Sequence, residues 1–268
     1  MKYKLIACDY DNTLGTRPDV ISEKNLGAVK KYLKEGGIFV VCSGRMLSSV
    51  RKITAKNDLD CDIIAYQGAV ISLKNGKTLF WGGIDTETSY KLLRIGESRN
   101  EHLNIFVDDV HYTDRLNEYT EFYEKSSGTV CVKAKGKLSD FVKDNNLVCQ
   151  KICIMNPADE TKEKIDFYAK EFPYLEVNSG ATCLTEIVDL KMNKGNALKR
   201  IAEYYGMDIS ETIAIGDSTN DISMIEVAGL GIAVGDGDEE LKGKADVIAP
   251  DFKEDAVAYV IENYCKNG

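Results

Sequence analysis

Short apolar runs alternate with amphipathic stretches at both ends of the chain, and this alternation limits the folds that the chain can adopt. Apolar runs at residues 4–8 and 38–42 flank a helix-like segment at 22–35, and a second helix-like segment begins near Met46. Strands and helices in this order predict a parallel sheet with helices on both faces. Further strand-like runs lie at 62–66, 69–73 and 78–81, the last two joined by an Asn-Gly hairpin signal.

The alternation stops after Gly82-Gly83 and returns near residue 193. The returning part has a helix-like segment at 194–205, another after Asn220, and strand-like runs at 212–215, 231–234 and 246–248. The two ends of the chain are therefore expected to share one sheet. We expect an α/β fold whose doubly wound, mostly parallel core is formed by residues 1–82 and 188–268.

The middle of the chain has a different pattern. Its helix-like segments at 87–100 and 159–171 lie among strand-like runs at 103–107, 148–155, 175–177 and 183–187. Strands and helices grouped in this way are typical of an α+β module with an antiparallel sheet. We expect residues 83–187 to form such a module, inserted into the core.

Composition narrows the classes of function. The net charge of −9, with no basic stripe to offset it, argues against a nucleic-acid partner. A charged leader and an apolar stretch of about 18 residues are both missing, so we expect neither secretion nor a membrane span. The eight cysteines are scattered, which is typical of free thiols in a reducing compartment. We expect a cytoplasmic protein.

Two acidic residues follow the first apolar run. Asp9 and Asp11 come directly after Leu5-Ile6-Ala7-Cys8, and they share one side of an extended chain while Tyr10 points to the other. A divalent cation would let both carboxylates lie close to one phosphate group. A solvated turn explains the same two residues equally well when they are considered alone.

Two more strand-like runs end in polar turns. Residues 38–42 lead into Ser43-Gly44-Arg45, in which a hydroxyl can donate to a phosphate oxygen and the glycine permits close approach. Residues 212–215 lead into Gly216-Asp217-Ser218-Thr219-Asn220-Asp221, whose carboxylates suit magnesium. Ligands bind at the carboxyl ends of parallel strands, so these turns are expected to meet. Taken singly, each turn is also explained by ordinary local structure, such as Asp221 capping the next helix.

Lys194 stands at an unfavourable place for a cation. Asn193 is expected to cap the helix at 194–205, which puts Lys194 in its first turn, where the helix dipole disfavours positive charge by about 0.3–1 kcal/mol. An anion bound at this helix end would compensate. The alternative is a lysine that faces solvent.

These segments together resemble the four signatures of the haloacid-dehalogenase-like superfamily, and more narrowly its Cof-like phosphatases. The resemblance implies a Rossmann-like core of the superfamily's type with a large α/β cap, which would be the inserted module and would select the substrate. The segments that carry the resemblance are Asp9-Tyr10-Asp11-Asn12-Thr13, Ser43-Gly44-Arg45, Lys194-Gly195 and Gly216-Asp217-Ser218-Thr219-Asn220-Asp221.

The resemblance also implies catalytic roles. Asp9 would be the nucleophile that forms an aspartyl-phosphate, and Asp11 the general acid and base. Mg²⁺ would bind Asp9, the backbone carbonyl of Asp11 and Asp217, while Asp221 supports or shares the metal's ligand shell. The metal stabilises the ionised Asp9, whereas Asp11 must begin protonated to donate to the leaving group.

A second set of residues would hold the phosphate. Ser43 and Lys194 would bind phosphoryl oxygens, and Asn220 would reach the same group. Tyr10 and Gly44 would contribute backbone amides. Spreading the charge of the equatorial oxygens is the main task in phosphoryl transfer.

Two residues depart from the family's pattern. Asn12 replaces the usual glycine, and because asparagine tolerates positive φ we expect the turn to survive. Gln67-Gly68-Ala69 stands where many relatives have Asn-Gly-Ala, so a substrate contact inherited at this position is in doubt.

We expect, from this resemblance, a magnesium-dependent phosphatase that hydrolyses a small phosphorylated metabolite, such as a sugar phosphate or a phosphorylated cofactor. One alternative is a phosphomutase of the phosphomannomutase type, although the inserted module has only Arg94, Arg99 and Arg115 to bind a second phosphate. Another is a phospho-acceptor signalling or binding module. The motifs select no particular substrate and carry no information on oligomeric state.

Overall fold

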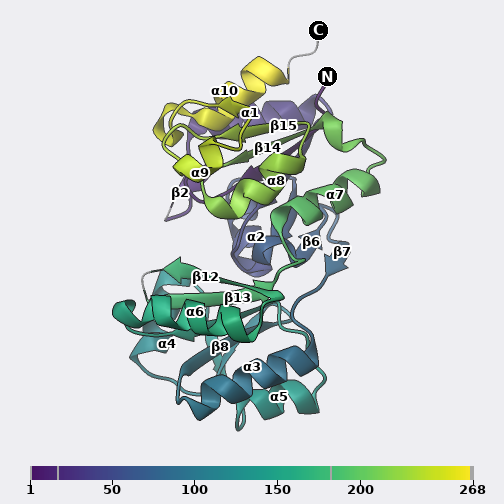
Figure 1. Cartoon of the computed structure of the whole chain (residues 1–268). Helices are drawn as coiled ribbons and strands as arrows, with labels where there is room; N and C mark the ends of the chain where they lie inside the picture. The colour runs from purple at the N-terminus through teal and green to yellow at the C-terminus, as the bar shows by residue number, and fades with distance from the viewer. Residues whose placement is uncertain (1, 17, 182, 266–268) are drawn as a thin grey trace. The chain divides into compact units, whose positions relative to one another are not determined.

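The chain forms two compact units. The computed structural model describes residues 2–16, 18–181 and 183–265. One unit, the core, consists of Met1–Trp81 and Asn193–Gly268, and the other, the insert, consists of Gly82–Met192 (Figure 1). Each unit has its own sheet and its own group of buried apolar side chains.

The core is built on an eight-stranded sheet with the order β16-β15-β14-β1-β4-β5-β6-β7. Strands β16 to β5 run parallel, and β6 and β7 continue the sheet as an antiparallel hairpin. The predicted doubly wound, mostly parallel sheet is therefore confirmed. The strands are β1 (Leu5–Asp9), β4 (Ile38–Cys42), β5 (Asp62–Ala65), β6 (Val70–Ser72), β7 (Thr78–Trp81), β14 (Thr212–Gly216), β15 (Leu230–Ala233) and β16 (Val247–Ile248). A separate small hairpin pairs β2 (Gly15–Thr16) with β3 (Val20–Ile21).

Helices cover both faces of the core sheet (Figure 1). The face that carries Leu5, Ala7 and Val40 packs against α7 (Lys194–Tyr204), α8 (Ile222–Val227) and α9 (Glu239–Lys242). On the other face, α1 (Glu23–Lys34) and α10 (Ala256–Tyr264) pack together, while α2 (Leu47–Lys56) packs against β5. The central strand β1 is buried throughout, as its unbroken apolar sequence requires.

The insert has a six-stranded sheet with the order β10-β9-β8-β11-β13-β12. Its neighbouring strands are antiparallel except for β9 and β10, which confirms the predicted α+β character. The strands are β8 (His102–Val107), β9 (Val110–Thr113), β10 (Cys131–Lys133), β11 (Lys151–Met155), β12 (Leu175–Ala181) and β13 (Leu184–Asp189); the helices are α3 (Thr86–Ser98), α4 (Glu118–Ser127), α5 (Leu138–Asp144) and α6 (Thr161–Glu171).

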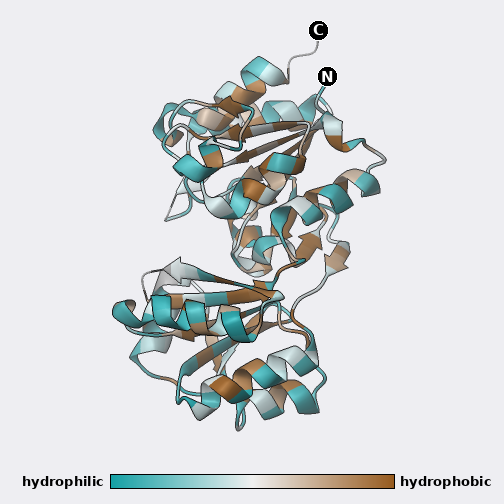
Figure 2. Cartoon of the chain, viewed as in Figure 1, coloured by the Kyte–Doolittle hydropathy of each residue, from teal (hydrophilic) through white to brown (hydrophobic). Residues whose placement is uncertain are grey.

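The two faces of the insert sheet differ in polarity. Apolar residues of one face, among them Leu103 and Ile152, join the buried cluster formed with α3, α5 and α6. Alternate positions on the same strands, such as Asn104 and Lys151, belong to the opposite face. In the core the strands are mostly apolar, whereas the outer helix surfaces of both units are mostly hydrophilic (Figure 2).

The structure adds detail that the sequence pattern did not predict. Strands β9 and β10 and helices α4 and α5 lie in residues 108–147, a region for which we predicted no elements. The expected return to the core at residue 188 falls inside β13, whose pairing with β12 continues to Asp189. No helix in the described part of the chain is long and apolar enough to cross a membrane.

Candidate active site

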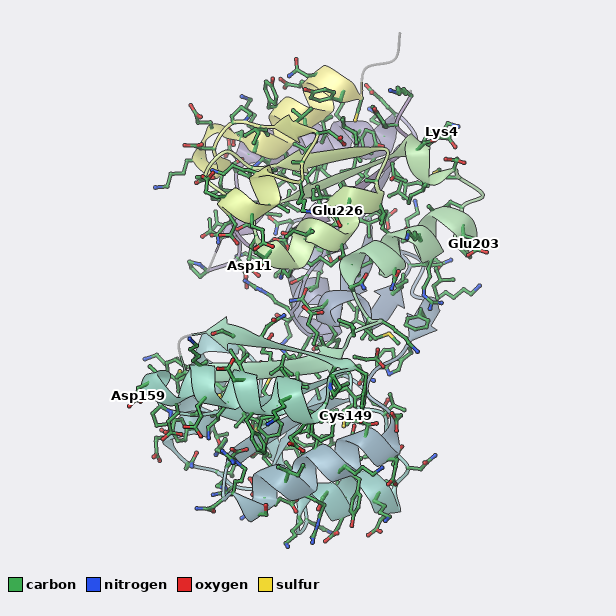
Figure 3. The ribbon with its side chains drawn as sticks, viewed as in Figure 1. Lys4, Asp11, Cys149, Asp159, Glu203 and Glu226 are labelled. Atoms are coloured by element: carbon green, nitrogen blue, oxygen red, sulfur yellow. The ribbon has the colours of Figure 1, made fainter. Side chains whose placement is uncertain are left out.

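The polar turns of the core meet because their strands are neighbours. Strand β1 lies between β4 and β14, with Asp9 paired to Cys42 and Cys8 paired to Ile215. The turns after these three strands therefore lie at one edge of the sheet, because parallel strands have their carboxyl ends at the same edge. Asp11 lies in the turn after β1, and Figure 3 labels it among the side chains.

Three carboxylates converge at this edge. Asp9, Asp217 and Asp221 each place an oxygen within 4.8 Å of the others. Asp9 and Asp221 are buried, and Asp217 is partly buried. Burial, together with the nearby carboxylates, raises the pKa of Asp9 well above its ordinary value, although Lys194 opposes this shift. Burial and Asp221 likewise raise the pKa of Asp217 to about 6. A cation at this position would favour the ionised forms.

Lys194 lies inside this cluster. Its Nζ is 2.5 Å from Asp9 Oδ1 and 2.6 Å from Asp221 Oδ1, and its side chain is 0% exposed. Burial disfavours the charged amine, yet Asp221 and Asp9 hold the pKa of Lys194 above its ordinary value. The alternative of a solvent-facing lysine is wrong. Asn193 caps α7 as predicted, since its side chain accepts a hydrogen bond from the Asn196 amide at 2.9 Å.

Asp221 also organises the turn after β14. Its Oδ2 accepts hydrogen bonds from the backbone amides of Asp217 and Ser218, at 3.1 and 3.2 Å. A Cβ at Gly216 would lie 2.5 Å from the Asp221 side chain, so the turn needs glycine at this position. Asn220 Oδ1 lies 3.5 Å from Lys194 Nζ and accepts from Ser218 Oγ at 2.9 Å. Asp221 therefore both shapes the turn and neutralises Lys194.

Ser43 and Gly44 form the turn after β4. Ser43 is buried, and its Oγ accepts a hydrogen bond from the Arg45 amide at 3.1 Å. A Cβ at Gly44 would lie 2.5 Å from Gln67 Nε2. The amide of Tyr10 already donates to the Cys42 carbonyl at 3.1 Å, so a phosphoryl oxygen would have to share or replace that bond. The predicted phosphate contacts of these residues stay predictions.

Arg45 binds Asp11, a contact that our sequence analysis missed. Its Nε and Nη2 donate to the two oxygens of Asp11 at 2.9 and 2.5 Å, and Nη1 donates to Asp19 at 2.7 Å. The guanidinium also lies 4.9 Å from the centre of the Tyr10 ring. The sequence did contain a signal for this contact, because Arg45 is a cation that follows Ser43 by two residues, in a turn expected at the same sheet edge as Asp11. The Asp11 carboxylate lies outside the three-carboxylate cluster, and its role as a metal ligand through the backbone stays a prediction.

Asn12 completes the turn after β1. Its φ of 57° lies in the left-handed region, and its amide donates to the Gly15 carbonyl at 2.8 Å. The expectation that asparagine supports this turn is confirmed. Thr13 Oγ1 donates to Asp217 Oδ1 at 3.2 Å, which links the turn to the acidic cluster.

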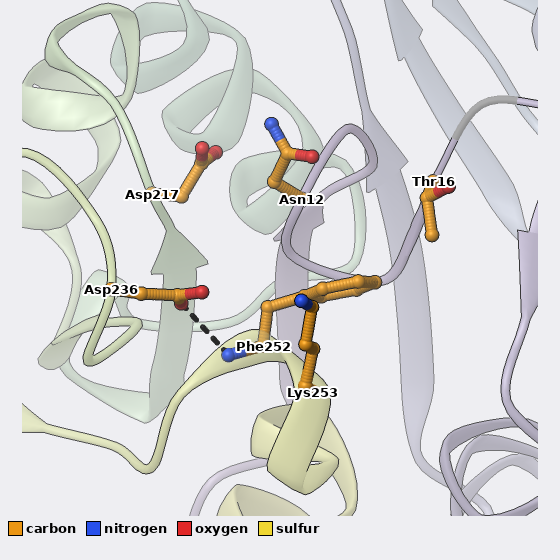
Figure 4. A pocket seen from close by; sticks show the side chains of 6 residues that line it. All are labelled: Asn12, Thr16, Asp217, Asp236, Phe252 and Lys253. Carbon is orange, nitrogen blue, oxygen red and sulfur yellow. Dashed lines mark hydrogen bonds between the residues drawn. The ribbon is translucent and has the colours of Figure 1, made fainter.

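A pocket of about 350 Å³ adjoins Asp217 (Figure 4). Among the residues that line it, the Phe252 amide donates to Asp236 Oδ1 at 2.8 Å. Magnesium takes oxygen ligands and retains several waters, so a cluster of three carboxylates, of which Asp217 lines a pocket, fits this ion. The residues that line the pocket are Asn12, Thr16, Asp217, Asp236, Phe252 and Lys253.

Most of the chain is similar to known proteins. A family model described as haloacid dehalogenase-like hydrolase matches residues 6–261. A putative phosphatase of Haemophilus influenzae is 27% identical over 98% of both chains. The 5-amino-6-(5-phospho-D-ribitylamino)uracil phosphatase YwtE of Bacillus subtilis is also 27% identical, over 97% of both. The solved structure of TM0651 from Thermotoga maritima has a TM-score of 0.89 and 26% identity, covering 99% of this chain and 98% of that one.

Proposed function

Because the chain belongs to the haloacid dehalogenase-like hydrolases, as the Cof-like resemblance predicted, we propose that it is a magnesium-dependent phosphatase of small phosphorylated metabolites. The proposed reaction passes through an aspartyl-phosphate on Asp9. Family membership and the phosphatase relatives both support the hydrolysis of a phosphate monoester.

The observation that carries the proposal is the position of Asp9. Its carboxylate ends the buried central strand, and it contacts Lys194 beside Asp217 and Asp221. Lys194 is held there by two carboxylates with no exposure to solvent. A nucleophilic carboxylate next to a buried cation suits attack on a phosphoryl group, whose negative charge the cation stabilises.

The proposed chemistry divides the work between two aspartates. Asp9 attacks phosphorus, the bond to the leaving oxygen breaks, and Asp11 donates a proton to that oxygen. Water then attacks the phosphoryl group, Asp11 takes a proton from it, and phosphate leaves Asp9. Both Asp11 oxygens accept from Arg45 in this structure, so Asp11 must leave at least one of these bonds to donate a proton.

The proposed ligands of the magnesium ion and of the phosphoryl oxygens all come from this chain. Asp9, Asp217 and the backbone carbonyl of Asp11 would hold magnesium, with Asp221 supporting the shell. When bound, the ion would supply positive charge that stabilises the ionised nucleophile and the phosphoryl oxygens. Ser43, Lys194 and Asn220 would bind the same oxygens, together with the amides of Tyr10 and Gly44.

We infer the substrate class from the relatives. Three Bacillus subtilis relatives are named as phosphatases of 5-amino-6-(5-phospho-D-ribitylamino)uracil, at 26–27% identity. That compound is a phosphorylated polyol attached to a heterocycle, so this chain is proposed to accept polyol or sugar phosphates. A cytoplasmic location is proposed with it, supported by the eight cysteines, all of them free.

A substrate screen tests the proposal. Release of inorganic phosphate is measured over a panel of phosphorylated metabolites, first with Mg²⁺ and then with excess EDTA. We expect turnover of at least one polyol or sugar phosphate and its loss in EDTA. Formation of an isomeric phosphate ester without free phosphate would instead support a mutase, and a stable phosphoprotein without turnover would support a phospho-acceptor module.

A further inference from the structure

The turn after β5 has an unusual backbone. Tyr66, Gln67 and Gly68 have consecutive φ angles of 50°, 57° and 112°. L-residues other than asparagine and aspartate rarely adopt this left-handed conformation, and two bulky ones in succession are costly. Strain of this kind persists where surrounding structure enforces it, and it concentrates at functional sites.

The surrounding structure here is the candidate active site. The Tyr66 amide donates to the Arg45 carbonyl at 3.0 Å, and the Gln67 amide donates to the Ser43 carbonyl at 3.2 Å. On the other side, a Cβ at Gly68 would lie 2.3 Å from the Asn193 carbonyl oxygen. The strained turn is therefore held between the proposed phosphate-binding turn and the cap of the helix that carries Lys194.

This backbone places the Gln67 carboxamide against Gly44. A Cβ at Gly44 would lie 2.5 Å from Gln67 Nε2, so the glycine leaves room for the amide. Gln67 Oε1 is buried and has no hydrogen-bond partner in the part of the chain that the structure describes, although the residue as a whole is partly exposed. Leaving a buried acceptor without a hydrogen bond costs free energy. A donor from a bound ligand would remove this cost, since the described residues supply none.

We propose that Gln67 selects substrates by binding a hydrogen-bond donor on the leaving group. This inference rests on the proposed phosphatase function. The phosphoryl group of an ionised monoester offers acceptors only, so it cannot satisfy Oε1, whereas a hydroxyl beside the ester oxygen can. The terminal torsion of glutamine is broad, so the amide can turn its oxygen toward the site. The same hydroxyl can accept a hydrogen bond from Nε2. The favoured class is therefore phosphate esters of polyols and sugars.

Two matched substrates and two variants test this inference. Glycerol 1-phosphate and propyl phosphate have the same carbon chain but differ in their hydroxyls, and p-nitrophenyl phosphate reports the phosphoryl chemistry without a leaving-group donor. Gln67→Met keeps the length of the side chain and removes its hydrogen bonds. Lys74→Met introduces the same residue at an exposed position in the β6–β7 hairpin, and serves as the control.

In the wild type we expect kcat/KM for glycerol 1-phosphate to exceed that for propyl phosphate by about tenfold. Gln67→Met should bring this ratio close to one, with p-nitrophenyl phosphate turnover within about threefold of wild type, and Lys74→Met should preserve the ratio. An unchanged ratio in Gln67→Met, an equal loss on all three substrates, or a wild-type ratio of one would overturn the assignment. Absence of phosphate release by the wild type from all three substrates and from the whole metabolite panel would instead overturn the proposed function itself.

Discussion

Both units bury a lysine against carboxylates, but the two lysines occupy different kinds of position. In the core, Lys194 contacts Asp9 and Asp221 at the carboxyl edge of a parallel sheet. In the insert, Lys151 contacts Glu186 at 2.7 Å on a face of an antiparallel sheet. Desolvation opposes the charge of each lysine, yet the pKa of both lies above the ordinary value, because Asp221 and Asp9 act on Lys194 and Glu186 acts on Lys151.

The difference lies in what surrounds each pair. Two buried carboxylates at Lys194 converge with a third, and this cluster is the candidate site for a cation and a phosphate group. Around Lys151 the same sheet face carries buried neutral groups instead. Burial lowers the pKa of His102 and His111, and the polar side-chain atoms of these two residues and of Asn104 have no hydrogen-bond partner among the described residues. A buried lysine therefore indicates catalysis only where strand ends bring further charged groups to it.

The largest expected effect is that of Asp9→Asn. Removing the proposed nucleophile should lower turnover by at least about 10⁴-fold. The variant should keep its fold, because the neutral amide avoids the burial of a charge while Lys194 retains Asp221. Phosphate release and thermal melting measure the two properties. Turnover close to that of wild type would contradict the assignment of Asp9.

Replacing each lysine by methionine tests the comparison directly. Lys194→Met should lower kcat about 100- to 1,000-fold and cost about 3–5 kcal/mol of unfolding free energy, because two buried carboxylates lose their cation. Lys151→Met should cost about 1–3 kcal/mol, since Glu186 remains accessible to water, and should leave hydrolysis of p-nitrophenyl phosphate within about threefold of wild type. Similar losses of kcat in the two variants would show that the two pairs are not functionally distinct.

Magnesium and pH should act on the core cluster together. The pKa of Asp217, about 6 without metal, lies above its ordinary value of 3.8. In EDTA, protonated Asp217 therefore stabilises the folded state below about pH 4, and this stabilisation is lost as the pH rises through about 6.

Adding Mg²⁺ at pH 7 should raise the melting temperature. At a concentration of 100 times Kd, the bound ion should add about 2.7 kcal/mol to the free energy of unfolding. Asp217→Asn should remove most of this response, and an unchanged response would refute its role as a ligand.

The insert should respond to acid in the opposite direction. Burial, Lys151 and His102 lower the pKa of His111 from 6.5 to about 4. The unfolded chain then takes up a proton before the folded one, so stability is lost as pH falls from about 6.5 through 4. We expect a loss of about 2 kcal/mol between pH 7 and pH 5.

His111→Phe should abolish most of this loss. The new ring can keep the stacking on Phe106, whose centre lies 4.7 Å from that of His111. Hydrogen exchange of the β8 and β9 amides at the two pH values measures the effect within the insert. An equal acid sensitivity in the variant would assign it to other groups.

Local sequence was enough to predict much of the candidate site. Apolar runs that end in Asp9, Ser43 or Asp217 predict strand ends, and parallel strands bring such ends together. Lys194 stood out because a cation in the first turn of α7 opposes the helix dipole, but this signal alone left a solvent-facing lysine as the alternative. In contrast, the short strands β9 and β10 escaped notice, because three- and four-residue strands show little periodicity.

The sequence by itself determined the alternation of strands and helices, the interruption by the insert, and the identity of the acidic turns, since these depend on local pattern. Only the tertiary structure decided that Lys194 is buried between Asp9 and Asp221, that Arg45 binds Asp11, and that Gln67 lies against Gly44. The physical reason is that burial and pairing depend on groups far apart in the chain. Asp9 and Asp11 show this: local sequence places both after the first strand, and only the tertiary structure pairs Asp9 with Lys194 and Asp11 with Arg45.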